Sequence, residues 1–348
     1  MHMNKDKDFS ESLLSWYDKN ARVMPWRLPP NSQKKPNPYF IWLSEIMLQQ
    51  TTVVTVSSYF NKFTTKWPNI TELSNAYDHD VMASWAGLGY YARARNLLKC
   101  ARIIVAQYDG FFPQSYEKLI KLPGIGPYTA SAILSIAFSR PHAVLDGNVE
   151  RVISRYYSIL DPLPDSKGEL KILAQSNLSN HRPGDHNQAI MDLGAMICTP
   201  TRPHCSGCPV NFACKAYIIG NAELLPKKLP KKNKPLKFGS LFIGVHPTNG
   251  FLLERRAENG LLGGMLGWPS TDWSECPSSR PPLSADWVLV PGLVRHTFTH
   301  FNLELNIYRA IIKRSLDPYL FIPLKNFNSS DMPTVMRKAY DLYLISED

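Results

Sequence analysis

Four of the six cysteines in this 348-residue sequence lie close enough together to bind a metal. They have the spacing Cys-x6-Cys-x2-Cys-x5-Cys and are Cys198, Cys205, Cys208 and Cys214. Four thiolates in one short loop can ligate Zn²⁺ or an iron–sulfur cluster. Structural zinc sites usually use two closely spaced cysteine pairs, and only one such pair is present here. The spacing therefore favours a [4Fe–4S] cluster and leaves zinc as the alternative.

Two carboxylates stand in contexts that suit acid catalysis. Glu45, in WLSEIMLQQT, is flanked by apolar residues, which can raise the pKa of a carboxyl and make it a general acid. Asp146, in VLDGNVERV, precedes a helical pattern, where a carboxylate could stabilise a developing positive charge. Each has a structural alternative, a first-turn glutamate for Glu45 and an N-cap for Asp146. Taken singly, both residues favour the structural alternative.

The segment LPGIGPYTA, residues 122–130, predicts a tight turn between two helices. Gly124 and Gly126 allow a sharp reversal, and Pro127 suits the first position of the second helix. Glycines let a phosphate approach the backbone, and the N–H groups at a helix start can bind an anion. The segment is therefore typical of a helix-hairpin-helix that grips the DNA backbone without reading its sequence. The alternative is a plain corner between helices.

Composition sets broad limits on the class of protein. Lys and Arg number 39 against 29 Asp and Glu, a formal net charge of +10, which favours an acidic partner such as nucleic acid. No apolar run is long enough to span a bilayer, and the N-terminus MHMNKDKDFS is too polar for a secretory signal. We therefore expect no membrane association and a cytoplasmic protein.

The elements that would position these residues fall into two domains. Apolar spacing predicts a mostly helical domain over residues 1–222, with the helix-hairpin-helix at about 115–138 and the cysteine loop at 198–214. Residues 223–237 are rich in Lys and Pro and predict an extended linker. Residues 238–348 predict a smaller α/β domain that begins with a hairpin at the Asn-Gly pair of HPTNGF.

Six motifs occur together and in order: WLSEIMLQQT, GLGYYARARNL, LPGIGPYTA, VLDGNVERV, QAIMDLGAMIC and the cysteine loop. Together they resemble the helix-hairpin-helix DNA glycosylases, and in particular the adenine DNA glycosylases of the MutY type. The resemblance covers nearly all of residues 9–220 and continues into the second domain. It implies a DNA repair enzyme that hydrolyses the N-glycosidic bond of adenine mispaired with 8-oxoguanine or guanine. Such an enzyme flips its target base out of the duplex.

The resemblance also implies roles for individual residues. Glu45 would protonate the flipped adenine, and Asp146 would stabilise the oxocarbenium-like sugar, as paired carboxylates do in glycoside hydrolysis. Tyr128 and Asn148 would assist them. The residues expected to line or support the adenine pocket are Arg22, Trp26, Arg27 and Asp192. Those expected to contact DNA in this domain are Gln50 and Tyr90, which would enter the duplex, Gly124 and Gly126 of the hairpin, and Arg202 of the cysteine loop.

The four cysteines match the ligands of one [4Fe–4S] cluster, and the second domain resembles the Nudix-like recognition domain of the family. That domain lacks the Glu-rich Nudix box, so we expect no pyrophosphatase activity. RHTFTHFNLEL places Phe298, Thr299 and His300 at the 8-oxoguanine, although by itself the segment indicates only an alternating strand. The expected partner is double-stranded DNA containing A:8-oxoguanine or A:G mispairs, with the protein acting as a monomer and nucleoid-associated when bound.

Three positions depart from the family pattern. Residues 28–38 form a longer polar, proline-rich segment, predicted to be a surface loop. Thr299 stands where some members carry serine, and Glu150 stands where some carry a lysine near the sugar, so no lysine adduct is expected there.

Two rival functions remain to be distinguished. The first is a bifunctional glycosylase and lyase resembling endonuclease III, which carries a lysine nucleophile where this chain has Tyr128. The absence of lysine at that position predicts base removal without strand cleavage. The second is a non-catalytic iron–sulfur protein that only locates lesions, and the presence of both Glu45 and Asp146 argues against it.

Overall fold

The structure, a computed structural model, describes residues 8–230, 233–257, 260–278, 280–313 and 319–346. The chain divides into two compact units, Met1–Pro230 and Lys231–Asp348. The first unit extends past residue 222, because the Leu163 N–H donates to the Lys227 carbonyl and Leu229 donates back to Leu163. Of the predicted linker, Lys231 and Lys232 lie outside the described residues, as do residues 1–7 of the N-terminal segment.

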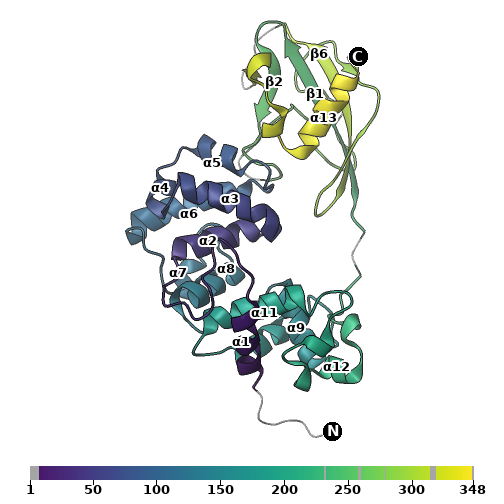
Figure 1. The fold of residues 1–348 in the computed structure, drawn as a ribbon. Helices are drawn as coiled ribbons and strands as arrows, with labels where there is room; N and C mark the ends of the chain where they lie inside the picture. Colours follow the sequence, from purple (N-terminus) through teal and green to yellow (C-terminus); the bar gives the residue numbers. More distant parts are fainter. Residues whose placement is uncertain (1–7, 231–232, 258–259, 279, 314–318, 347–348) are drawn as a thin grey trace. The chain divides into compact units, whose positions relative to one another are not determined.

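The first unit is helical, as the apolar spacing predicted (Figure 1). Its helices are α1 (Phe9–Asn20), α2 (Pro38–Leu48), α3 (Val53–Lys66), α4 (Ile70–Ser74), α5 (Asp78–Trp85), α6 (Ala92–Tyr108), α7 (Tyr116–Leu119), α8 (Pro127–Ala132), which continues into the π-helix η1 (Ile133–Ala137), α9 (Gly147–Tyr157), α10 (Lys167–Ser176), α11 (Pro183–Met196) and α12 (Lys215–Ile219). Within the described residues, no helix has the length and apolar composition needed to cross a bilayer.

Helix α2 lies between two separate hydrophobic clusters of the first unit. Leu43, Ile46 and Met47 pack into the cluster formed with α3 to α8, whereas Ile41 packs into the cluster formed with α1, α9, α10 and α11. The α8–η1 segment is shared in the same way, with Ile133 in the first cluster and Ala132 in the second. Glu45 of α2 and Tyr128 of α8 line a cavity beside these two clusters.

The LPGIGPYTA segment forms the predicted reversal between α7 and α8. Gly124 has a φ of +78°, and a side chain there would also approach Asn96, so the position favours glycine. Gly126 is the N-cap of α8 and provides no side-chain cap, and Pro127 is the first residue of the helix. A Cβ added at Gly126 would meet no atom within 4 Å, so the backbone at this point is open to a close partner.

In its described residues, the second unit is a mixed sheet covered by one α-helix. Its strands are β1 (Leu236–His246), β2 (Gly250–Arg255), β3 (Leu266–Gly267), β4 (Val288–Leu289), β5 (Val294–Thr297), β6 (Asn302–Ile311) and β7 (Leu320–Ile322). The main order is β3-β2-β1-β6-β4, with β5 paired to β6 and β7 paired to β2. The predicted Asn-Gly hairpin is confirmed, because β1 and β2 pair antiparallel with His246 opposite Gly250. The long central strands β1 and β6 run parallel.

Helix α13 (Thr334–Ile345) completes the core of the second unit. Its Met336 and Ala339 are fully buried against Trp268, whose indole Nε1 donates to the Met336 carbonyl at 3.0 Å. A helix packed on a sheet of this size agrees with the α/β domain expected from the sequence.

Candidate active site

Glu45 lies in a deep cavity between the two hydrophobic clusters. It is three residues before the last residue of α2, so it is not the first-turn glutamate of the structural alternative. Its exposed fraction is only 6%. The cavity has a volume of about 450 Å³ and is called here the Glu45 cavity. The predicted site residues that line it are Arg22, Trp26, Arg27, Glu45, Gln50, Tyr128, Asp146 and Asn148.

Burial controls the charge of Glu45. Loss of hydration raises its pKa from 4.5 to about 7, and the charge of Asp146 acts in the same direction. Tyr128 and Arg27 oppose this shift by favouring the ionised form. A carboxyl with a pKa near 7 holds its proton in a large fraction of molecules at neutral pH. Glu45 can therefore donate a proton under ordinary conditions.

Asp146 is held rigidly at the start of α9. Its Oδ1 accepts hydrogen bonds from the backbone N–H groups of Asn148 at 3.0 Å and Val149 at 2.8 Å, which makes it the N-cap of the helix. Its Oδ2 accepts a third bond from the Asn148 side-chain amide at 2.9 Å. The structural alternative for Asp146 is thus correct, and it does not exclude a chemical role. The two backbone donors at the helix start and the Asn148 amide together hold the carboxylate at the cavity.

Tyr128 belongs to the first turn of α8, directly after the glycine reversal. Burial raises the pKa of its phenol well above 10, and the charges of Glu45 and Asp146 add to the effect. The hydroxyl therefore remains protonated, and it lies 3.4 Å from the Met191 sulfur. A phenol in this state can donate a hydrogen bond but cannot act as an amine nucleophile.

Asp192 supports the site from behind the cavity wall. It is fully buried and binds two arginines, with Arg22 Nε at 2.7 Å from Oδ1 and Arg27 Nη1 at 2.7 Å from Oδ2. The Arg22 backbone N–H adds a third bond at 3.0 Å. These bonds join residues far apart in the sequence and fix both guanidinium groups at the cavity. Asp192 therefore positions the arginines and does not itself line the Glu45 cavity.

Gln188 lines the cavity but was not assigned a role from the sequence. It is largely buried, and its side-chain amide donates to the Gly184 carbonyl at 3.3 Å. The sequence could have indicated Gln188, because it lies four residues before Asp192 on α11 and residues four apart share a helix face. Met24 and Met191, also in the lining, carried no such signal.

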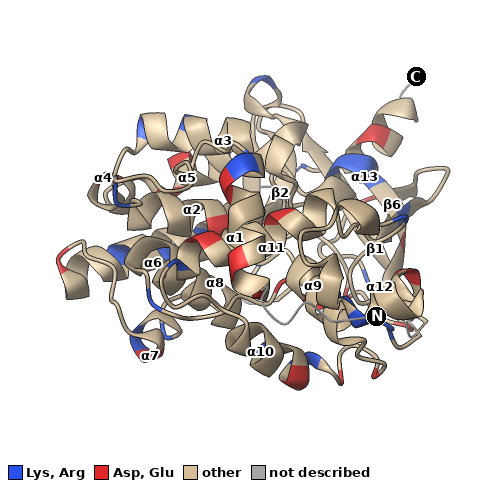
Figure 2. Cartoon of the chain, turned by 60° about the horizontal axis from the view of Figure 1, so that its bottom comes forward, with Lys and Arg blue, Asp and Glu red and all other residues tan. Residues whose placement is uncertain are grey.

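The two residues expected to enter the duplex lie at turns. Gln50 follows α2, lines the Glu45 cavity and has a φ of +61°. Tyr90 precedes α6, has a φ of +48° and is 58% exposed. Helix α6, which follows it, carries Arg and Lys but no Asp or Glu (Figure 2). The outer surface at this turn is thus suited to an anionic partner.

The four cysteines line one small cavity. Cys198 follows α11, Cys205 and Cys208 bracket a single 3₁₀ turn, and Cys214 is the N-cap of α12. None of the four is in a disulfide. Arg155, fully buried, donates to the Cys198 sulfur at 3.3 Å and to the Thr199 carbonyl at 2.7 Å. Among the described residues, no three His, Cys, Asp or Glu side chains are arranged to hold a single metal ion.

The predicted 8-oxoguanine contacts lie at the tip of the β5–β6 hairpin in the second unit. Phe298 donates its N–H to the Phe301 carbonyl at 2.9 Å, which closes the turn, and Thr299 and His300 between them are exposed. The Phe298 ring packs in tilted contact with the rings of Trp273 and Phe301 and is half-buried. The two polar residues are therefore free to contact a partner, and the phenyl ring is held in place.

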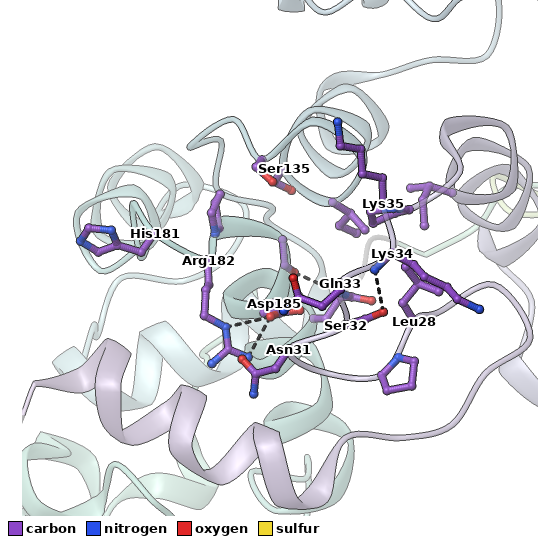
Figure 3. Close-up of a pocket in the computed structure, with 18 residues that line it drawn as sticks. Leu28, Asn31, Ser32, Gln33, Lys34, Lys35, Ser135, His181, Arg182 and Asp185 are labelled. Atoms are coloured by element: carbon purple, nitrogen blue, oxygen red, sulfur yellow. Dashed lines mark hydrogen bonds and ion pairs between the residues drawn. The ribbon is translucent and has the colours of Figure 1, made fainter.

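The segment 28–38 forms a loop up to Asn37, the N-cap of α2, and its side chains are mainly exposed. It covers a second cavity of about 390 Å³ together with the start of α11, where Arg182 pairs with Asp185 (Figure 3). This loop cavity is distinct from the Glu45 cavity, although a few buried side chains line both. The shared residues are Ile41, Ile136 and Gln188.

The fold and the site define a base-excision DNA glycosylase. Residues 43–176 match the HhH-GPD superfamily of base excision DNA repair proteins, and residues 241–342 match the NUDIX domain family. The structure of a thermostable thymine-DNA glycosylase superposes with a TM-score of 0.54 at 29% identity, covering 61% of this chain and 95% of that one. A DNA complex of endonuclease III, at 21% identity and a TM-score of 0.51, shares the fold.

Individual relatives indicate which kind of DNA glycosylase this is. The adenine DNA glycosylase of Buchnera aphidicola from Schizaphis graminum is 40% identical over 96% of this chain and 98% of its own. The human adenine DNA glycosylase is 34% identical over 96% of this chain and 74% of its own. The chain belongs to the adenine DNA glycosylase family and is a hydrolase of N-glycosyl bonds in DNA.

Because the pKa of Glu45 is raised in the folded state, we expect ionisation of this carboxyl at high pH to lower the free energy of unfolding. The folded state binds this proton more tightly than the unfolded state, so the contribution to stability is present below pH 4.5 and is lost as the pH rises through about 7. Glu45→Gln is uncharged at every pH. We expect it to unfold at a higher temperature than wild type at pH 8 and at a similar temperature at pH 4, measured by thermal denaturation.

Glu150→Gln is the control for removing a carboxylate from the same unit. Glu150 pairs with Lys167 at 2.9 Å, so its loss gives no stabilisation at pH 8. A Glu45→Gln variant that is no more stable than wild type at pH 8 would contradict the burial of an ionisable carboxyl at this position.

Proposed function

We propose that the protein removes adenine mispaired with 8-oxoguanine or guanine in duplex DNA and leaves the strand intact. The observation that carries the proposal is that one cavity holds both Glu45, whose pKa burial raises to about 7, and the hydrogen-bonded Asp146 side chain. These are the two groups that cleavage of a glycosidic bond through an oxocarbenium-like species requires. The family membership of the chain supports adenine as the base.

The reaction begins with an adenine flipped into the Glu45 cavity. The guanidinium groups of Arg22 and Arg27, held by Asp192, and the indole of Trp26 form a polar and aromatic wall suited to a purine. Gln50 and Tyr90 occupy the space that the adenine leaves in the duplex. Extrusion of a mispaired base costs a few kcal/mol, less than extrusion of a well-paired one.

Glu45 then donates its proton to a ring nitrogen of adenine, and the bond between base and sugar breaks with its electron pair going to the base. Neutral adenine is the leaving group, and the sugar carries the positive charge. Asp146, fixed by Asn148 and the start of α9, stabilises that charge. Water adds its hydroxyl to the sugar to give the abasic product, and its remaining proton restores Glu45. General acid catalysis of this kind contributes about 10²- to 10⁴-fold.

Strand cleavage is not expected because the cavity offers no amine nucleophile. A lyase needs a lysine to form a Schiff base with the sugar. The described residues that line the Glu45 cavity include no lysine, and Tyr128 stands where the related lyases carry it. Glu150, which stands where some relatives carry a lysine, supports the same conclusion because a carboxylate cannot form a Schiff base.

Adenine release tests the reaction directly. We expect release under single-turnover conditions from duplexes with adenine opposite 8-oxoguanine or guanine, and far slower release opposite cytosine or thymine. Glu45→Gln should lose at least about 10²-fold in rate, because it cannot donate the proton. Borohydride added during the reaction should trap no strong covalent adduct.

Two outcomes would overturn this proposal. Failure of the wild type to release adenine from any duplex would remove the enzymatic function and favour a protein that only locates lesions. A strong borohydride adduct would instead favour the bifunctional mechanism.

We further propose that the four cysteines hold one [4Fe–4S] cluster. The donor set of four free thiols lining one cavity suits a cluster, whereas a single zinc ion would need them converged on one point. When bound, the cluster supplies a cross-link between the end of α11, the cysteine loop and α12. Arg155 supports this arrangement by bonding both to the Cys198 sulfur and to the carbonyls around it.

Metal analysis of the purified protein distinguishes the two cofactors. We expect about four iron and four acid-labile sulfide per chain, and we expect Cys205→Ser to lose them. Cys276→Ser, which alters an isolated and exposed cysteine, is the control and should retain both. One zinc per chain with no sulfide would contradict the cluster.

The second unit is proposed to recognise 8-oxoguanine through the exposed tip of the β5–β6 hairpin. Truncation tests this role, and the structure places the cut after Pro230, because Lys227 and Leu229 still pair with Leu163 in the first unit. We expect the fragment to excise adenine opposite guanine and to lose the preference for 8-oxoguanine over guanine, measured as a ratio of single-turnover rates.

The matched test in the full-length chain is the double variant Thr299→Ala/His300→Ala. We expect it to lose less of the preference for 8-oxoguanine over guanine than the fragment does. An unchanged preference in both proteins would contradict the recognition role of the second unit.

A further inference from the structure

The turns that carry Gln50 and Tyr90 have strained backbones. Both residues are in the left-handed region, at φ values of +61° and +48°, and neither is glycine. Such a conformation is strained for a residue with a side chain and persists only where surrounding contacts fix it. Contacts elsewhere in the unit must therefore hold these turns in place before DNA is bound.

Arg93, in the first turn of α6, supplies contacts to both turns at once. Its Nη1 donates to the carbonyls of Ile46 and Met47, each at 3.0 Å, at the end of α2. Its Nη2 donates to the Thr51 hydroxyl at 3.4 Å in the turn that carries Gln50. Nη2 also donates to the carbonyls of the turn that carries Tyr90. These acceptors are Leu88 at 3.0 Å and Gly89 at 3.3 Å.

The guanidinium also lies over two aromatic rings. Its central carbon is 5.4 Å from the ring centroid of Trp85, which is fully buried, and 5.5 Å from that of the exposed Tyr90. Cation–π attraction favours a guanidinium placed over such rings. It joins the side chain that would enter the duplex to the hydrophobic core through one charged group.

A positive charge stabilises these acceptors. The last carbonyls of α2 have no partner within the helix and lie at the negative end of its dipole, yet α2 has no basic residue in its own last turn. In the described part of the chain, no carboxylate forms an ion pair with Arg93. Its charge is therefore directed at the carbonyls of the two turns, and Glu45 lies on the same helix just before them.

We infer that Arg93 is a positioning residue that couples the two turns, so that Gln50 and Tyr90 enter the duplex together when the adenine is extruded. The inference rests on the proposed function of these two residues. It predicts that loss of the coupling impairs extrusion of the base more than cleavage of the glycosidic bond.

The variant Arg93→Lys keeps the positive charge but should lose the hydrogen bonds that join the two turns. A lysine ammonium is a point charge, whereas the planar guanidinium presents a fixed fork of donors that can reach both turns. Arg102→Lys is the matched control, because Arg102 lies on the same helix and also donates to backbone carbonyls. Its acceptors are the carbonyls of Ser74, the last residue of α4, and Ala76, and it also pairs with the Asp78 carboxylate at 2.8 Å.

The test compares two duplexes that differ in the cost of extruding adenine. In one, adenine stands opposite guanine; in the other, it stands opposite an abasic site, where extrusion breaks no base pair. We expect Arg93→Lys to lose about 10²-fold in single-turnover rate on the first duplex, the effect of a small misplacement of groups near a reaction, and much less on the second. Arg102→Lys should match wild type on both.

Tyr90→Ala tests the same coupling from the other side. If Arg93 acts through the turns, the double variant should lose little more activity than the worse single variant, instead of the product of the two losses. Should the lysine variant unfold, Arg93→Met keeps the aliphatic stem without the buried charge and replaces it in the same assays.

An equal loss on the two duplexes, no loss on either, or fully multiplicative losses in the double variant would overturn the inference. Failure of the proposed function has a different signature. In that case wild type releases no adenine, or Tyr90→Ala alone excises adenine as fast as wild type.

Discussion

The burial of one carboxyl, that of Glu45, is the constraint on which the rest of this site depends. An ionised carboxylate is poorly solvated in the cavity between the two hydrophobic clusters, so the side chain keeps a proton up to about pH 7. The position is unfavourable for folding and favourable for acid catalysis. The nearby Asp146 strengthens the effect, while Tyr128 and Arg27 limit it. The proposed chemistry thus follows from where α2 places this residue.

The helices around Glu45 hold the other polar groups of the site in fixed positions. The start of α9 orients Asp146 with three hydrogen bonds, and α11 fixes two arginines through the buried carboxylate of Asp192. Arg93 ties the end of α2 to the turn before α6. In each case one polar group satisfies a helix end or an ion pair and also positions part of the site. Structural and functional roles are therefore not alternatives here, as Asp146 shows most directly.

The sequence predicted features that depend on local pattern. The glycine reversal before Tyr128, the Asn-Gly hairpin of the second unit and the clustering of the four cysteines follow from residues that are neighbours in the chain. The placement of Glu45 near the end of α2 did not follow, because apolar spacing shows that a helix exists but locates its ends poorly. Nor did the partners of Arg93 or of Asp192, since those hydrogen bonds cross long stretches of sequence and appear only when the clusters pack.

A direct measurement of the Glu45 pKa tests the account most simply. The protein would be labelled with ¹³C at glutamate side-chain carboxyls, and their NMR shifts followed with pH in wild type and in Glu45→Gln. The account predicts one carboxyl that titrates near pH 7 in wild type and is absent from the variant. Titration of every glutamate carboxyl close to its ordinary value of about 4.3 would contradict it.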